Sequence, residues 1–129
     1  MSSVFLVIDD DMVSQFTARY AVEQCSGESQ IYVCESALEG LDLLTNLKIT
    51  NKPIPDYILV DLVMPEMNGW EFIDKLQNYN NSSRKIKVFI MSAFTNSKDR
   101  EKAKNHQLIE GYYEKPISKS MIQNMIKSY

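Results

Sequence analysis

The sequence is 129 residues long and carries 14 Lys and Arg against 17 Asp and Glu, a formal net charge of −3. This length fits one domain that buries a core without disulfide bonds, and the mildly acidic balance gives no electrostatic support for binding nucleic acid or an anionic membrane. The two cysteines, Cys25 and Cys34, belong to no cluster of Cys and His with zinc spacing, so we interpret both as reduced thiols.

The sequence contains no recognisable targeting or spanning segment. The stretch from Met1 to Ile8 lacks the basic region and apolar core of a signal peptide, and no apolar run approaches transmembrane length. We therefore expect a cytoplasmic protein with one domain over residues 1–129 and no output domain in this chain. The sequence leaves open whether the chain is full-length or a fragment.

The first strand and helix are marked by a change of pattern. Val4–Ile8 is a continuous apolar run, typical of a strand buried on both faces. It ends in the acidic run of residues 9–11, and Asp11 can cap a helix. We predict that helix over about residues 12–25, because apolar side chains recur there at helical spacing, at Val13, Phe16 and Tyr20.

A second strand and helix follow. Residues 31–34 have the pattern of a strand, and Ser36 with Glu39 forms a capping-box pair that opens a helix. Residues 51–55 contain two prolines and form a linker loop. We expect the apolar stripe of the second helix to consist of Leu38, Leu41 and Leu44.

The centre of the chain carries a single carboxylate at the end of a strand. An apolar run over residues 57–60 leads into Asp61, and Pro65 and Gly69 mark the loop behind it. Asn68 can cap the third helix. An isolated Asp after a strand is more often a turn residue than a reactive one, so its meaning depends on the rest of the chain.

The second half of the chain continues the alternation. A polar loop at 80–83 leads to a buried strand over residues 88–91, which stops at Ser92. The next helix, about residues 97–105, has little apolar surface and should be exposed and loosely held. A short strand over residues 111–114 then runs into Lys115.

The last helix is amphipathic. Ser118 can cap it, and Pro116 stands shortly before it. Its apolar positions are Ile117, Met121, Ile122, Met125 and Ile126.

Five strands alternating with five helices predict an α/β fold. Right-handed crossovers force a parallel sheet covered on both faces, with the expected order 2-1-3-4-5 of a flavodoxin-like, doubly wound sheet. Ligands of such sheets bind at the carboxyl ends of the strands, where the order reverses. Asp9, Asp10 and Asp61 should therefore converge on one crevice, with Ser92 and Lys115 approaching from strands 4 and 5.

The predicted cluster needs a positive charge. Close carboxylates repel one another by about 4 kcal/mol per pair at ~4 Å and an effective dielectric constant of ~20, so they require a cation, a shared proton or a lysine. Oxygen ligands without His or Cys favour a hard ion, Mg²⁺ with Mn²⁺ as a substitute. An Asp at such a site can act as a nucleophile towards a phosphoryl group.

In this order, the motifs resemble the receiver domain of two-component response regulators, in particular stand-alone receivers like the chemotaxis regulators. They are Asp9-Asp10 after strand 1, the run from Asp61 through Pro65 to Gly69, Ser92-Ala93, and Lys115-Pro116, and the resemblance covers essentially the whole chain. It implies that Asp61 is the phosphoacceptor. It also implies a Mg²⁺ site made of Asp9, Asp10, Asp61 and the Val63 backbone carbonyl.

The same resemblance assigns the remaining site residues. Ser92 becomes the switch hydroxyl, Lys115 the phosphate-binding lysine and Tyr112 the switch aromatic residue, and the Lys115–Pro116 peptide bond is expected to be cis. The implied donor is a sensor histidine kinase or a histidine phosphotransfer protein. Phosphorylation would change the surface of helix 4, strand 5 and helix 5, which contacts a target protein that the sequence does not identify.

The resemblance also implies limits on activity and assembly. The protein would not be an enzyme beyond its own phosphorylation and autodephosphorylation, and would be a monomer or a phosphorylation-dependent homodimer. Val63 and Phe94 would border the phosphoryl group. Because neither can orient a water molecule by hydrogen bonding, we predict that they slow hydrolysis of the phosphorylated state.

Three other functions compete with this interpretation. A Mg²⁺-dependent aspartyl-phosphate phosphatase of the haloacid-dehalogenase type would need a second Asp two residues after Asp61, where Val63 stands. A receiver-like interaction module would work without phosphorylation, although the acidic site is complete. An FMN carrier of flavodoxin type is disfavoured because acidic residues occupy the first strand-to-helix turn, where a phosphate cradle would be needed.

Overall fold

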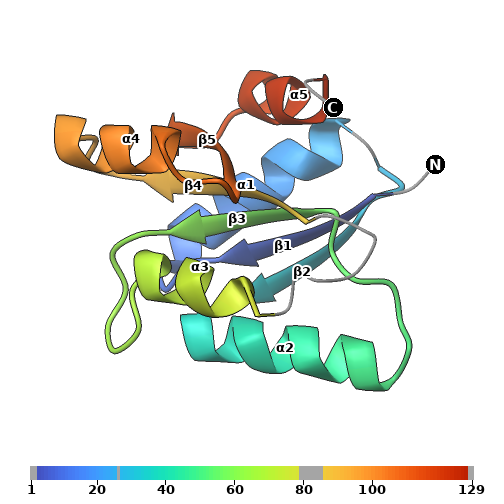
Figure 1. Ribbon diagram of the computed structural model, residues 1–129. Coiled ribbons are helices and arrows are strands. Elements are labelled where there is room, and N and C mark those ends of the chain that lie inside the picture. Colours follow the sequence, from blue (N-terminus) through green and yellow to red (C-terminus); the bar gives the residue numbers. More distant parts are fainter. Residues whose placement is uncertain (1–2, 26, 79–85, 128–129) are drawn as a thin grey trace.

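The computed structural model describes residues 3–25, 27–78 and 86–127, so the polar loop expected at 80–83 lies outside the described residues. Five parallel strands form one sheet in the order β2-β1-β3-β4-β5, as predicted (Figure 1). The strands are β1 (Val4–Ile8), β2 (Gln30–Cys34), β3 (Tyr57–Asp61), β4 (Lys87–Ser92) and β5 (Ile109–Glu114). The helices between and after them are α1 (Met12–Cys25), α2 (Ala37–Ile49), α3 (Gly69–Leu76), α4 (Ser97–Lys104) and α5 (Lys119–Lys127).

Helices cover both faces of the sheet. Figure 1 shows α1 and α5 on one face and α2 and α3 on the other. Alternate residues of β1 serve the two layers: Phe5 packs in the core beneath α1 and α5, and Leu6 in the core beneath α2 and α3. Burial on both faces explains why the strand sequences are continuous apolar runs rather than alternating ones.

Several predicted bounds were short by one or two residues. The second strand begins at Gln30, the fourth spans Lys87–Ser92 and the fifth begins at Ile109. The polar residues Gln30 and Lys87 join the sheet through their backbones, opposite Val4 and Tyr57. A hydrophobic pattern does not detect such residues because their side chains add nothing to it.

Helix α1 has the predicted bounds, but the side chains that identified it face solvent. Val13, Phe16 and Tyr20 are 71%, 69% and 54% exposed. The face that packs on the sheet is made of small or short side chains, Ala18, Ala21 and Val22. Small residues let the helix approach closely, so the buried face is the less conspicuous one in the sequence.

The predicted stripe of α2 was wrong in one member. Leu41 and Leu44 are buried, whereas Leu38 is 58% exposed. The buried stripe includes Ala37 and Gly40, so it follows the spacing i, i+3, i+4, i+7 from Ala37. Leu38 lies about 100° around the helix from Ala37 and therefore points away from the sheet.

The predicted helix caps are present. The Asp11 carboxylate accepts a hydrogen bond from Ser14 N at 2.9 Å, and Ser36 Oγ accepts one from Glu39 N at 3.1 Å. Asn68 forms a full capping box at the start of α3, and Ser118 Oγ accepts from Met121 N at 3.3 Å. These caps fix where each helix begins behind its strand.

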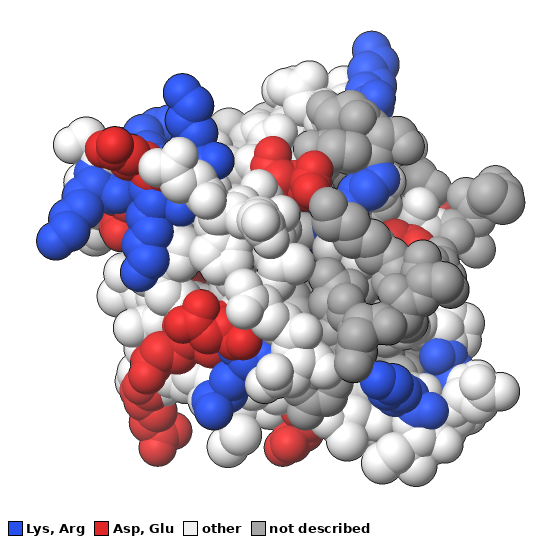
Figure 2. All heavy atoms as spheres, in the orientation of Figure 1, with Lys and Arg blue, Asp and Glu red and all other residues white. Residues whose placement is uncertain are grey.

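Helix α4 is exposed, as its polar sequence predicted. Ala103 is its buried residue, and it ends at Lys104, one residue earlier than expected. Two of its cations lie over aromatic rings of other elements: Arg100 is 5.2 Å from the ring centre of Tyr112, and Lys102 is 4.4 Å from that of Trp70. Figure 2 shows Lys and Arg side chains gathered where Figure 1 places α4.

Two expectations about the whole chain can be compared with the structure. Cys25 and Cys34 are both free thiols. Among the helices of the described residues, none is long and apolar enough to cross a bilayer.

Candidate functional site

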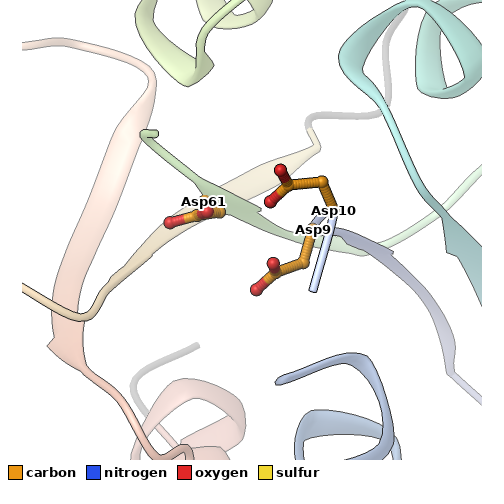
Figure 3. A group of neighbouring side chains, drawn as sticks. All are labelled: Asp9, Asp10 and Asp61. Atoms are coloured by element: carbon orange, nitrogen blue, oxygen red, sulfur yellow. The ribbon is translucent and has the colours of Figure 1, made fainter. Parts of the chain in front are cut away.

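Three carboxylates meet where β1 and β3 end. Asp61 is the last residue of β3 and Asp9 directly follows β1, which pairs with β3 in parallel. One carboxylate oxygen from each of Asp9, Asp10 and Asp61 lies within 4.8 Å of the others, and the three side chains extend to the same side (Figure 3). Asp9 and Asp61 are buried and Asp10 is exposed, so the cluster opens to solvent on one side.

Lys115 brings a positive charge to this cluster from the end of β5. Its Nζ atom lies 2.6 Å from Oδ2 of Asp9 and 3.5 Å from Oδ1 of Asp61. The Lys115 backbone N–H donates to the Ser92 carbonyl at 2.8 Å, and the Lys115–Pro116 peptide bond is cis. With all groups ionised, three carboxylates and one ammonium leave two negative charges at the site.

Burial governs the ionisation of Asp61. The pKa of its carboxyl group is raised to about 6, chiefly because burial removes water from it, and the nearby Asp9 carboxylate also acts to raise it. The Lys115 ammonium and a hydrogen bond from the Val63 backbone N–H act in the opposite direction. Removal from water is the largest of these effects, and it favours the neutral acid. A cation bound beside Asp61 would act against it and favour the charged form.

Hydrogen bonds of its side chain and backbone hold Asp9 in place. Its Oδ1 atom accepts a hydrogen bond from Asp11 N at 2.9 Å, and its backbone N–H donates to the Cys34 carbonyl at 3.1 Å. Its own carbonyl accepts a hydrogen bond from Gln15 Nε2 at 2.7 Å. Nothing in the sequence points to this role of Gln15, because a lone Gln in a helix carries no motif.

Ser92 is buried one residue beyond the strand position opposite Asp61. In the sheet register Asp61 pairs with Met91, so Ser92 lies at the carboxyl end of the neighbouring strand. The Ser92 hydroxyl donates to the Phe94 carbonyl at 2.7 Å and accepts from the Phe94 N–H at 3.2 Å. The hydroxyl is therefore engaged in a local turn.

Tyr112 is half-buried on β5, opposite Ile90 of β4. Its ring packs against the core beneath α2 and α3, with the Arg100 guanidinium over it. The Tyr112 hydroxyl is shielded from solvent and makes no hydrogen bond within the described part of the chain. Tyr112 thus links β5 to α4, and its hydroxyl forms no hydrogen bond with the acidic cluster.

The loop behind Asp61 passes very close to the third helix. A Cβ atom on Gly69 would lie 2.4 Å from the Asp61 backbone oxygen and 2.9 Å from the Leu62 Cα atom. Only glycine fits at this point, so its role is more specific than that of a turn residue. Val63 and Phe94, which follow β3 and β4 in the chain, are 71% and 81% exposed.

The donor set suits a hard divalent cation. The cluster offers carboxylate oxygens alone, and its two excess negative charges would be neutralised by one such ion. The exposed Asp10 leaves a route from solvent to the site.

Residues 5–127 match the family model described as the response regulator receiver domain. The chain belongs to this family. It is 31% identical to the polar-differentiation response regulator DivK of Brucella ovis over 129 residues, which cover 100% of this chain and 97% of DivK.

Other relatives are longer. The receiver is 31% identical to the sensor histidine kinase CheAY of Helicobacter pylori over 126 residues, which cover 96% of this chain but 14% of CheAY. It spans 55% of the probable transcriptional regulator ycf29 of Porphyra purpurea. Among solved structures, a two-component response regulator from Cytophaga hutchinsonii has a TM-score of 0.86 and 25% identity, covering 99% of this chain and 96% of that one.

Membership gives the receiver its general role. Receivers of this family act in two-component signal transduction and phosphorelays, where they interact with histidine kinases and downstream targets. They are mainly signalling domains rather than enzymes, and they generally bind Mg²⁺ at an acidic pocket.

Proposed function

We propose that this receiver carries a phosphoryl group on Asp61, delivered by a sensor histidine kinase or a histidine phosphotransfer protein. The observation that carries the proposal is the placement of the Lys115 ammonium between Asp9 and Asp61, at 2.6 and 3.5 Å, beside three converging carboxylates. A buried acid beside a fixed cation and an acidic cluster has the arrangement that phosphoryl transfer requires, which is positioning and charge compensation.

Asp9, Asp10, Asp61 and the Val63 backbone carbonyl would hold Mg²⁺, with Mn²⁺ as a substitute. The chain supplies oxygen ligands at the site, and the bound ion would compensate negative charge on the phosphoryl oxygens. Asp10 is the most accessible of the three carboxylates and would form the outer side of the site.

The transfer step moves the phosphoryl group from nitrogen to oxygen. An Asp61 carboxylate oxygen attacks the phosphorus atom of the donor's phosphohistidine, and the bond between phosphorus and the imidazole nitrogen breaks. The imidazole nitrogen keeps the electron pair and takes up a proton. Lys115, already beside Asp61, would neutralise charge on the transferred group, and Ser92 would donate a hydrogen bond to it.

The receiver would signal by a change around Ser92. Its hydroxyl proton now binds the Phe94 carbonyl, so donation to a phosphoryl oxygen would break that bond and free the Phe94 backbone. Tyr112 would follow, and because Arg100 lies over its ring, α4 would move with it. The surface of α4, β5 and α5 would then change its affinity for a downstream protein.

Phosphorylation is tested with a small-molecule donor. Purified receiver is incubated with Mg²⁺ and acetyl phosphate or phosphoramidate, and the mass of the intact protein is measured. We expect the mass of one phosphoryl group to be added to the wild type and not to Asp61→Asn, with the exposed Asp74→Asn as a matched control that behaves as wild type. Equal labelling of wild type and Asp61→Asn would contradict the proposal.

Two rival functions predict other results in the same assay. A receiver-like module that works without phosphorylation would gain no mass under any of these conditions. A phosphatase would release phosphate steadily from a phosphomonoester, which Val63 disfavours because it stands where that chemistry needs an acid. Size-exclusion chromatography of the same samples would separate a monomer from a phosphorylation-dependent homodimer.

A further inference from the structure

Gln15 makes a contact with the metal site that the proposed function does not use. It is the fourth residue of α1, and its backbone N–H donates to the Asp11 carbonyl at 3.0 Å. Its side chain turns back past the start of the helix and donates from Nε2 to the Asp9 carbonyl at 2.7 Å. Because a backbone carbonyl only accepts hydrogen bonds, the amide must present its NH₂ group there.

The bonded carbonyl belongs to the peptide between Asp9 and Asp10. A peptide unit is planar, so fixing its carbonyl also fixes the direction of the Asp10 N–H. The torsions on either side of this peptide, ψ of Asp9 and φ of Asp10, set where the two carboxylates stand relative to each other. The hydrogen bond from Gln15 therefore acts on both acidic side chains at once.

The two acids differ in how firmly the rest of the protein holds them. Asp9 is fully buried, and its carboxylate contacts Asp11 N at 2.9 Å and Lys115 Nζ at 2.6 Å. Asp10 is exposed. For Asp10, the described contacts act on its backbone: Gln15 orients the peptide before it, and the hydrogen bond from Asp11 N to Asp9 Oδ1 orients the peptide after it.

We propose that Gln15 is a positioning residue for the metal site: its amide locks the Asp9–Asp10 peptide and so preorganises the two carboxylates for a divalent cation. The inference rests on the proposed function, because it concerns the same Mg²⁺ site. Ordering a backbone before binding removes an entropic cost that the cation would otherwise meet. Groups that orient metal ligands without touching the metal commonly alter affinity by about tenfold or more.

The test measures Mg²⁺ affinity by calorimetric titration of metal-free receiver. Gln15→Met keeps the side-chain length and removes the donor, and we expect it to raise the Kd for Mg²⁺ by about tenfold. The same substitution at the exposed Gln24, near the end of the same helix, should leave the Kd unchanged. Phosphorylation by acetyl phosphate at saturating Mg²⁺ should proceed at nearly the wild-type rate in Gln15→Met.

A second variant separates positioning from simple electrostatics. Gln15→Glu has the same shape, but its carboxylate repels the Asp9 carbonyl and adds a negative charge near the cation. If Gln15 positions the peptide, Gln15→Glu weakens Mg²⁺ binding as Gln15→Met does. If net charge alone mattered, Gln15→Glu would tighten it, and that result would overturn the proposal. It also serves as the deciding variant if Gln15→Met does not fold.

The failure of this inference is distinguishable from failure of the proposed function. If Gln15→Met binds Mg²⁺ with the same Kd as the wild type, the proposed role of Gln15 is wrong and the metal site stands. Wild-type receiver that binds no Mg²⁺ would overturn the metal site and, with it, the inference.

Discussion

Asp61 is buried beside a second carboxylate, and in metal-free receiver this makes its charge costly. Its pKa is raised to about 6 in the folded state, against about 3.9 for an unperturbed Asp. The folded state thus holds the proton more tightly than the unfolded state. Ionisation therefore lowers the free energy of unfolding as the pH rises from about 4 to about 6, by up to about 3 kcal/mol.

Asp61→Asn should remove this cost. Without divalent cations, we expect the variant to be more stable than wild type by about 1–3 kcal/mol at pH 7.5, and the difference to vanish below about pH 4, where Asp61 is neutral in both states. Urea unfolding across this pH range in a chelating buffer measures it, with Asp74→Asn as control. A difference in stability between Asp61→Asn and wild type that does not depend on pH would contradict the raised pKa of Asp61.

Gly69 stands where the chain after Asp61 meets α3. Gly69→Ala should cost about 1–3 kcal/mol of stability, because the new Cβ atom would meet backbone atoms of Asp61 and Leu62 that cannot move aside without shifting β3. Gly27 is the matched control, since nothing lies within 4 Å of a Cβ placed there. Thermal unfolding of Gly69→Ala and Gly27→Ala measures the two changes in stability. Equal changes would show that the close approach at Gly69 is unimportant.

Phe94 is predicted to slow loss of the phosphoryl group. Its ring is 81% exposed in this conformation, so shielding requires it to swing towards the site when Ser92 leaves the Phe94 carbonyl. Phe94→Ala, Phe94→Asn and Val63→Asn should each shorten the lifetime of phosphorylated receiver several-fold. A smaller side chain lets water reach the phosphoryl group, and an Asn side chain can also orient that water by a hydrogen bond. The lifetimes are measured by following the loss of the phosphoryl mass from the protein. Variant lifetimes equal to that of the wild type would argue against this role.

At the scale of elements, α4 is held by contacts that are weak one by one. It buries Ala103, and Arg100 and Lys102 add cation–π contacts worth about 0.5–1 kcal/mol each at exposed sites. Arg100→Gln and Lys102→Gln should therefore raise hydrogen exchange of the α4 amides while changing global stability little.

Lys98→Gln changes the same charge on the same helix and serves as control for these two variants. It removes one positive charge, as the other two variants do, but from the first turn of α4, and it keeps the contacts with Trp70 and Tyr112, so it should not raise α4 exchange above the wild-type level. Exchange that rises equally in all three variants would assign the effect to charge rather than to the aromatic rings.

The elements also show what the sequence can and cannot predict. Helix α1 was placed correctly by Phe16 and Tyr20, although both face solvent, because a helical period is visible whichever side the apolar residues occupy. Its packed face of Ala and Val is inconspicuous. The orientation of a helix depends on which face the sheet accepts, and that is decided by tertiary packing rather than by the local pattern.

For the molecule as a whole, strand order and the meeting of strand ends followed from the alternation of elements and the right-handed crossover rule. This is why Asp9, Asp61 and Lys115, far apart in the sequence, could be expected together, as the structure now has them. The reach of Gln15 back to the Asp9 carbonyl and the turn of Ser92 onto Phe94 depend on side-chain torsions, which no sequence pattern encodes.

The central claim is that Asp61, and no other acid of the cluster, carries the phosphoryl group. Borohydride reduces an aspartyl phosphate to homoserine, so receiver treated with acetyl phosphate and Mg²⁺, then reduced and digested, records the modified position by peptide mass spectrometry. We predict homoserine at position 61 and Asp at positions 9 and 10. Homoserine at position 9 or 10, or at none of the three, would contradict the account.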